Sequence, residues 1–494
     1  MSLSSDNLRE AGGVEGDSSL RGDLGASSIL FMVMAAAAPL TVVGGAIPVG
    51  ILLGNGEAFP AMFIVATITL LLFSVGLMAM SKHLPDAGAF FTYISHGIGT
   101  IPGVAAAYLA IVTYTTIQIA VFALFGSAIS ADLVVLGAPA VPWWFIVLLA
   151  IVVVGTLGNR HIELSSKVLV CVLVLEVGIV LALAAAIAIK GGAEGLSVGP
   201  FKLQNLLSGS PALGLMFAIV SFIGFESTVV YRSEVRDPNR TIPLATYGSA
   251  LIIGAFYLIA AIAVIWGIGP SKLTEYISAD PSTVLQRLTE TYLGQTGAVI
   301  VSVLFLSSMF ACVLSLHNVL ARYQYSMAKA KLLPSPLGSA HKAHGSPHVA
   351  SLVQVVSAAV ITGLVAALQI PAASVFAWFA GIGTLAIVAL MAATCLAVMV
   401  FFARNKLENS FVRTTIAPGL GLIGLSVSAW LITANFPLLV GDVNAKGQPM
   451  WGIVSDILVA VVVIGAIVGA CQAVVLRIRN PSAYRNITKR LDRS

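Results

Sequence analysis

Long apolar segments dominate this chain and decide what it can fold into. Residues 58–80, 163–189 and 243–268 each exceed the roughly 20 apolar residues that cross a bilayer as a helix. Charged residues make up 10% of the 494 residues, against about 25% in a soluble domain, and the mean hydropathy is +0.99. The sequence therefore predicts an all-α integral membrane protein and excludes a soluble, collagen-like or disulfide-stapled fold.

The apolar segments predict twelve transmembrane helices. They lie at about 27–53, 58–80, 100–130, 142–158, 163–189, 211–231, 243–268, 297–327, 348–369, 372–402, 412–435 and 452–476. The polar, Gly- and Ser-rich residues 1–26 are expected to form a disordered cytoplasmic tail, and residues 479–494 a cytoplasmic C-terminal tail. An even number of spans puts both tails on the same side of the membrane.

The basic residues give these helices an orientation. If the N-terminus lies inside, only a few of the 26 Lys and Arg residues fall on the outer side, namely Lys190, Lys202, Lys272, Arg287 and Lys446. Because basic loops remain in the cytoplasm, we predict a multi-pass protein of the cell membrane with N- and C-termini cytoplasmic. The basic residues punctuate apolar segments and form no basic face, so nucleic acid is not an expected partner.

Neither the cysteines nor the histidines form a pattern typical of a metal site. The 4 cysteines lie inside apolar segments without CxxC spacing, and they are expected to be packing residues. His341, His344 and His348 lie in a loop that contains Gly and Pro and no cysteine. We therefore expect no metal site.

Two of the predicted helices carry helix-breaking residues in their middles. These are Pro39, Gly44, Gly45 and Pro48 in the first helix and Gly224 in the sixth. Lipid cannot satisfy the backbone groups that a break frees, so such breaks survive where they line a cavity or meet a ligand. Breaks in the first and sixth helices are typical of the inverted repeat of secondary transporters. The alternative is that the first helix merely kinks and that Gly224 is a packing glycine.

Three stretches of the chain carry a family resemblance. Residues 224–245 read GFESTVVYRSEVRDPNRTIPLA, residues 85–99 read PDAGAFFTYISHGIG, and residues 318–334 read NVLARYQYSMAKAKLLP before HKAHGSPHVA. The first stretch is similar to the helix 6 signature of the amino acid-polyamine-organocation superfamily, of bacterial amino acid permease type. The other two resemble that family's loop before helix 3 and its end of helix 8. The matching helix 6 residues are Gly224, Phe225, Glu226, Glu234, Asp237, Pro238, Arg240, Ile242 and Pro243.

The resemblance implies a LeuT-like fold, a 5+5 inverted repeat with discontinuous helices 1 and 6. On this alignment the transport core spans 27–403, with repeats at 27–189 and 211–403. Helices 11 and 12, within 404–478, are expected to be peripheral.

The resemblance also implies where substrate binds. In the family, backbone amides at the helix 1 break hold the substrate carboxylate, and backbone carbonyls at the helix 6 break hold its ammonium group. The charges of free helix ends agree with this arrangement. The implied substrate-binding residues are Pro39, Thr41, Val42, Val43, Gly44, Gly45, Phe222, Ile223, Gly224 and Phe225. Here Thr41, Val42 and Val43 replace the Gly-Ser-Gly of the family, and the glycines are displaced to Gly44 and Gly45.

Three residues around the helix 6 break are candidates for a gate. We expect Phe222 or Phe225 to close over bound substrate as an aromatic gate, with Glu226 beside it. The alternative for each phenylalanine is ordinary packing in the core or against lipid.

Two carboxylates at bilayer depth are the candidate proton-coupling residues. Glu226 follows the helix 6 break, and Glu176 lies in the apolar run VCVLVLEVGIV. A carboxyl group inside the membrane is costly and marks an ion or proton pathway by default. Some family members carry a lysine near the position of Glu176, and the reversed charge means that the lysine mechanism does not transfer. Two alternatives remain: a protonated structural acid, and a carboxylate that binds sodium.

The remaining polar residues of the helices have weaker claims. Gln118, Ser307 and Ser308 are expected to form hydrogen bonds between helices, and His317 to be a packing residue.

These patterns predict a secondary active transporter that moves amino acids or small amines by alternating access. Proton-coupled uptake of neutral amino acids is the preferred hypothesis, with a proton gradient in place of any cofactor, and the protein is expected to be a monomer or homodimer in lipid. An amino acid/polyamine exchanger and a sodium-coupled carrier are the alternatives within this class.

Other classes fit less well. A channel needs no pair of broken helices, and facilitators built from parallel six-helix halves break their helices differently. The sequence has no GxxxxGK[ST] motif of a nucleotide-driven pump. It also has no cluster of nucleophiles, His or Cys that would carry catalysis, so we predict no enzymatic activity.

Overall fold

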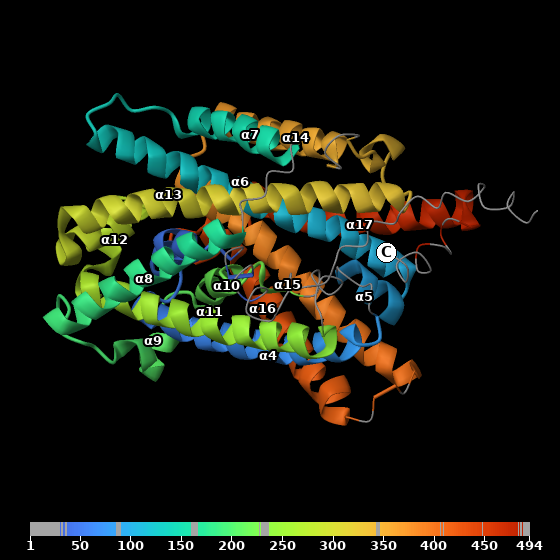
Figure 1. Cartoon of the computed structure of the whole chain (residues 1–494). Coiled ribbons are helices and arrows are strands. Elements are labelled where there is room, and N and C mark those ends of the chain that lie inside the picture. Colours follow the sequence, from blue (N-terminus) through green and yellow to red (C-terminus); the bar gives the residue numbers. More distant parts are fainter. Residues whose placement is uncertain are drawn as a thin grey trace, which may run out of the picture.

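The computed structural model of the protein is a bundle of helices (Figure 1). It describes residues 30, 33–34, 37–84, 90–159, 166–226, 228, 237–341, 346–405, 407–408, 410–446, 448–482, 484 and 487. Within these ranges the only β pairing is an isolated bridge between Val443 and Pro449. The described part of the chain is therefore all-helical, as the sequence predicts. The N-terminal tail, Glu234 and His344 lie outside the described residues.

Nine helices in the described ranges are long and apolar enough to cross a membrane. They are α4 (Phe59–Ser81), α6 (Thr100–Val135), α8 (Ser166–Lys190), α11 (Pro238–Ile268), α13 (Val284–Lys329), α14 (His348–Ala367), α15 (Ala372–Asn405), α16 (Ala417–Val440) and α17 (Ile453–Arg479). Three shorter apolar stretches are Pro39–Leu53, α7 (Trp143–Asn159) and α10 (Pro211–Val220). Every predicted apolar segment overlaps one of these elements. Twelve spans and the inverted repeat stay predictions.

Short elements join these helices. They are α5 (Phe90–Gly97), η2 (Gly56–Ala58), η3 (Gly199–Phe201), α9 (Leu203–Leu206), η5 (Pro270–Lys272), α12 (Leu273–Ala279), η6 (Pro281–Thr283), η7 (Ser335–Gly338) and η8 (Val412–Ile416). In Figure 1, α9 and α12 lie at the end of the bundle opposite the C-terminus. We refer to this end as the α12 end.

The helices differ in how deeply they are buried. In the most apolar 18-residue stretch of α15, 67% of the residues are buried. Helix α15 packs against α6, α4 and α16. In the corresponding stretch of α17, only 17% of the residues are buried. Because α17 is apolar around its whole circumference, its exposed side chains, such as Ile457, Ile464 and Ile467, suit a lipid environment. The order of burial puts α15 and α6 in the core of the bundle and α17 at its periphery.

Hydrogen bonds tie the connecting segments together at the α12 end. The Glu57 carboxylate accepts from Ser197 Oγ at 2.7 Å and from Asn205 Nδ2 at 3.0 Å. On the same loop, Glu194 accepts hydrogen bonds from the hydroxyl and the backbone amide of Ser271. These bonds hold the pKa of the exposed Glu194 carboxyl below its usual range. The loop after α8 is therefore fixed to segments that precede α4 and α12.

Helix α13 begins earlier than the sequence predicts. Its first residue is Val284, and the helix bends at Gly294, which has φ 78° and ψ 179°. The predicted start near residue 297 follows this bend. The turns before the bend contain several polar residues, so the hydropathy of the sequence does not predict them as part of the helix.

Candidate substrate and coupling site

The first apolar helix is interrupted at Ala37 and Ala38. Ala38 has the left-handed conformation, with φ 46° and ψ 70°, and Pro39 begins the next helix. Proline has no backbone N–H, so it cannot continue the hydrogen bonding of a preceding helix. From Pro39 the chain runs as α2 (Pro39–Thr41), a π-helical turn η1 (Val42–Ala46) and α3 (Ile47–Leu53) without leaving helical geometry.

The predicted position of this interruption, within Pro39–Gly45, is therefore wrong. Pro39, Thr41, Val42, Val43, Gly44 and Gly45 all lie in helical backbone, and all are buried. The glycines serve close packing instead. A Cβ atom on Gly44 would lie 2.6 Å from the Phe305 ring, and one on Gly45 would lie 2.4 Å from the Leu124 side chain.

The sixth apolar helix is interrupted where the sequence predicts it. Helix α10 ends at Val220, and residues 221–224 form turns. Gly224 has φ 110°, a conformation that L side chains rarely adopt. Residues 225, 226 and 228 have 3-10 helical geometry, and helix α11 begins at Pro238. A half-helix end is thus left within the bundle.

Tyr257 of α11 contacts both interruptions. Its hydroxyl donates a hydrogen bond of 3.3 Å to the carbonyl oxygen of Ala37. Its ring packs edge-on against Phe222, with 6.2 Å between ring centroids and an interplanar angle of 89°. Since Tyr257 is fully buried, the two interrupted segments meet inside the bundle.

The two candidate gate phenylalanines pack in different places. Phe222 lies against Phe63 and Tyr257, and Phe225 lies against Phe73 at 6.2 Å. Both side chains are 1% exposed, whereas Ile223 is half-buried. Their roles as gates and as substrate contacts stay predictions.

Glu226 joins the helix 6 interruption to α6. Its Oε2 accepts a hydrogen bond of 2.8 Å from the Gly224 amide, and its Oε1 accepts one of 3.0 Å from the Tyr114 hydroxyl. The carboxylate therefore satisfies an amide that the interruption frees. The sequence did not single out Tyr114. Tyr114 could have been recognised as a candidate because it carries a phenolic hydroxyl in an apolar helix. Such a group usually has a hydrogen-bond partner when it is buried.

Glu176 of α8 lies at the start of α2. Its Oε2 accepts hydrogen bonds from the Leu40 amide at 3.4 Å and from Ser308 Oγ at 2.9 Å. Thr41 Oγ1 in turn donates to Ser308 Oγ at 3.3 Å. The carboxyl group, which is buried, thus connects α8, α13 and the restart of the first helix. The sequence placed Ser308 only among hydrogen bonds between helices, and the structure adds its contact with Glu176.

A second polar cluster lies between α6, α13 and α14. Gln118 Nε2 donates to the carbonyl of Val313 at 3.0 Å, and its Oε1 accepts from Gln354 Nε2 at 2.7 Å. This confirms the prediction that Gln118 links helices. Ser307 instead donates to Leu304 within its own helix, and His317 Nε2 lies 2.8 Å from Ser351 Oγ. No group of three or more potential metal ligands occurs in the ranges that the structure describes.

The sequence matches a known protein family. The family model described as "Amino acid permease" matches residues 24–471. The chain belongs to the amino acid permease family. The permease is 23% identical to a probable amino-acid permease of Schizosaccharomyces pombe over 83% of its own length and 75% of the relative's.

Two relatives carry more specific names. The permease is 20% identical to the serine/threonine exchanger SteT of Bacillus subtilis over 70% of its length and 77% of SteT. It is 22% identical to the low-affinity putrescine importer PlaP of Escherichia coli over 56% of its length and 60% of PlaP. The permease is therefore a multi-pass membrane transporter of the amino acid-polyamine-organocation superfamily and not an enzyme.

We expect Tyr114→Phe to lower the transport rate of the permease about tenfold, because a buried acceptor left without its donor costs about 1–3 kcal/mol. The change removes the hydrogen bond to Glu226 and leaves the ring in place. Tyr108→Phe is the matched control, since this hydroxyl also lies on α6 but donates to the Leu332 carbonyl. Initial uptake rates in proteoliposomes measure the effect. Equal losses in both variants would show that the Glu226 contact has no special role.

Proposed function

We propose that this permease is a secondary active transporter that takes up neutral amino acids or small amines across the cytoplasmic membrane. Uptake is coupled to protons and proceeds by alternating access within a LeuT-like inverted repeat. The observation that carries the proposal is the meeting of the two interrupted segments at Tyr257. Interrupted helices leave amides and carbonyls free within a membrane, where only a ligand, water or protein can satisfy them.

The free helix ends supply the recognition chemistry. A restarting helix presents amides with partial positive charge, and an ending helix presents carbonyls with partial negative charge. The end of α10 suits the ammonium group of an amino acid, and the start of α2 suits its carboxylate once the Leu40 amide is released from Glu176. The apolar side chains nearby, including Phe222 and Phe305, favour a substrate with a small uncharged side chain.

The named relatives support an ammonium-bearing substrate. SteT is named for serine and threonine, and PlaP for putrescine. All three molecules carry a primary ammonium group, but only the amino acids carry a carboxylate. Exchange of one amino acid for another is the second candidate mode of transport after proton-coupled uptake, because SteT is named an exchanger.

Alternating access gives the two buried carboxylates their roles. For the substrate to reach either side in turn, the interrupted segments have to move against α6, α8 and α13. That movement breaks the Glu226 contact with Tyr114 and the Glu176 contacts with Leu40 and Ser308. In our proposal Glu176 takes up a proton when these contacts open and releases it when they form again.

The charge distribution supports an orientation. The α12 end carries Lys190, Lys202 and Lys272, and most of the 26 basic residues lie in the other loops and tails. On the positive-inside rule the α12 end faces outward, and both termini face the cytoplasm.

Transport assays on the full-length protein test this proposal. A thermal-shift screen against amino acids and amines first identifies ligands, because a ligand that binds only the folded state raises the Tm. Each ligand is then assayed in proteoliposomes with an imposed pH gradient. We expect saturable uptake that collapses with the gradient and is accelerated by unlabelled substrate inside. Flux without saturation would indicate a channel, and uptake that requires sodium or internal substrate would indicate one of the alternative carriers.

A further inference from the structure

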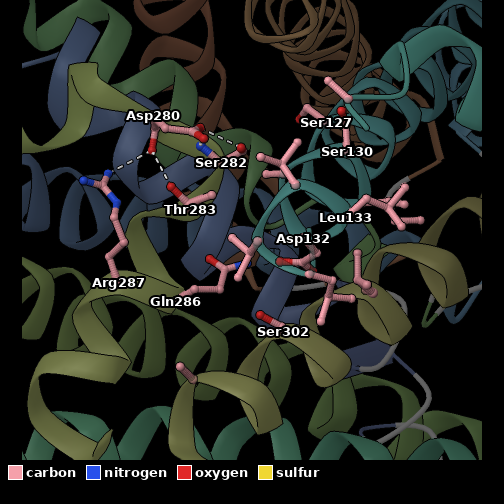
Figure 2. Close-up of a pocket in the computed structure, with 18 of the residues that line it drawn as sticks. Ser127, Ser130, Asp132, Leu133, Asp280, Ser282, Thr283, Gln286, Arg287 and Ser302 are labelled. Atoms are coloured by element: carbon pink, nitrogen blue, oxygen red, sulfur yellow. Dashed lines mark hydrogen bonds between the residues drawn. The ribbon is translucent and has the colours of Figure 1, made fainter. Parts of the chain in front are cut away.

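A large cavity lies at the α12 end, apart from the candidate substrate site. It measures about 1260 Å³ and is bounded by the C-terminal part of α6, residues 136–143, η6 and the first half of α13 (Figure 2). Of the described residues, none that lines it belongs to α2, η1 or the turn at 221–224. Pockets for small ligands usually measure about 300–1,000 Å³, so this cavity has room for such a ligand.

Two hydrogen-bond acceptors face the cavity without a donor. Gln286 is 9% exposed, and its Oε1 has no partner within the described part of the chain. The Asp132 carboxylate likewise has no hydrogen bond or ion pair with any described residue. In Figure 2 both side chains project into the cavity, one from α13 and the other from α6. A buried acceptor without a donor costs free energy, so the Gln286 oxygen leaves the site incomplete as the protein alone forms it, and the half-buried Asp132 carboxylate adds negative charge beside it.

Two donors in the cavity wall, Ser130 Oγ and Arg287 Nη2, are already engaged. The Ser130 hydroxyl donates to the Val141 carbonyl at 2.7 Å. Arg287 Nη2 donates to the carbonyls of Tyr276 and Asp280 at 2.9 and 3.0 Å, and the guanidinium group lies 4.3 Å from the centre of the Tyr276 ring. Figure 2 shows Arg287 turned toward Asp280. These bonds hold Arg287 Nη2 away from the two acceptors, while Arg287 Nε has no partner in the described part of the chain.

The rest of the wall is largely apolar, with scattered Ser, Thr and Gln side chains, and it carries two more acids. Trp143, Val299, Val303 and Leu306 line the cavity, and Val299 and Val303 are exposed on the surface of α13. Glu290 and Asp280 add two carboxylates to that of Asp132, and Asp280 Oδ1 already accepts from the amide and the hydroxyl of Ser282. A ligand that suits these walls is a cation that donates hydrogen bonds and has an apolar body.

We propose that this cavity binds a hydrophobic primary amine, with its ammonium group between Asp132 and Gln286. The site is additional to the substrate site and does not depend on which solute the permease carries. The same ammonium chemistry has two sources: a free amine such as 2-phenylethylamine, and a membrane lipid with an ethanolamine headgroup. A choline headgroup has no N–H to donate and does not satisfy the two acceptors.

The first arm of the test uses a free amine. Full-length protein in detergent is titrated calorimetrically with 2-phenylethylamine and with its uncharged analogue 2-phenylethanol. We expect the amine alone to bind, and Asp132→Asn and Gln286→Leu each to weaken its binding at least tenfold. Asp456→Asn is the matched control, because Asp456 is an exposed acid of α17 outside the cavity. A Tm equal to that of the unmodified protein verifies that each variant folds.

The second arm uses lipid. The permease is placed in nanodiscs that contain ethanolamine and choline phospholipids in equal amounts, and the lipids that stay bound are identified by native mass spectrometry. Retention of ethanolamine lipid that is lost in Asp132→Asn assigns the site to a lipid. Amine binding with the same dependence assigns it to a free amine.

One comparison separates this site from the substrate site. In a Gly224→Leu background, which disrupts the helix 6 interruption, amine binding to the cavity should persist. The proposal is overturned if Asp132→Asn changes neither arm, if 2-phenylethanol binds equally well, or if amine binding disappears with Gly224→Leu. Loss of transport in the Gly224→Leu variant tests the proposed transport function and neither supports nor contradicts the amine site.

Discussion

Gly224→Leu is expected to abolish uptake, with at least a hundredfold loss of transport rate. Gly224 has φ 110°, and a residue with a Cβ atom is strained in this conformation. Leucine would drive the backbone toward an ordinary helix and remove the amide from Glu226 Oε2, which it meets at 2.8 Å. The carbonyls at the end of α10 would then be withdrawn from the proposed ammonium site.

Glycine in an ordinary helical position provides the control for this experiment. A Cβ atom added to Gly363 of α14 would meet no neighbouring atom within 4 Å, so Gly363→Leu should transport normally. Uptake in proteoliposomes and the amount of folded protein after size-exclusion chromatography are measured for both variants. Undiminished uptake by folded Gly224→Leu would show that the helix 6 interruption is not part of the substrate site.

Glu176→Gln is expected to uncouple transport from the pH gradient. Glutamine keeps the size of the side chain and can still accept from Leu40 and Ser308, but it cannot take up or release a proton. Accumulation against a concentration gradient should therefore stop. Binding and exchange of substrate should remain, because neither requires net proton movement.

Paired assays separate coupling from binding. Counterflow of labelled substrate reports exchange, and pH-driven accumulation reports coupling, so only the second should fall, by at least tenfold. Glu275→Gln is the matched control, since Glu275 is an exposed acid of α12. Gradient-driven accumulation that survives in Glu176→Gln would remove Glu176 as the coupling residue and leave Glu226 as the candidate.

Local chemistry explains which parts of the site were predictable. The helix 6 interruption could be read from the sequence because Gly224 permits a positive φ and Glu226 supplies a polar partner close by. The helix 1 interruption could not be placed correctly, because it falls on Ala38, a residue type that normally favours helix. Pro39 was its only local signal. Gly44 and Gly45, which suggested the break, instead allow Phe305 and Leu124 to approach.

Contacts between residues that lie far apart in the sequence could not be predicted from local sequence patterns. The apolar runs predicted the all-helical fold because bilayer thickness sets helix length. Nothing local to Tyr114 or Tyr257 shows that their hydroxyls meet Glu226 and Ala37, since packing between helices decides those contacts. Similarly, the cavity beside Asp132 is lined by α13 residues on both sides of the bend at Gly294, and the hydropathy of the segment does not reveal this bend.

The position of Tyr257 has a consequence for leakage. A secondary transporter dissipates its driving gradient if its substrate site is open to both sides of the membrane at once. Because one aromatic ring touches Ala37 through its oxygen and Phe222 through its edge, neither interrupted segment can shift far without disturbing the other. Under the proposed alternating-access mechanism, this shared contact couples the movements of the two segments, so that the substrate site does not open to both sides of the membrane at once.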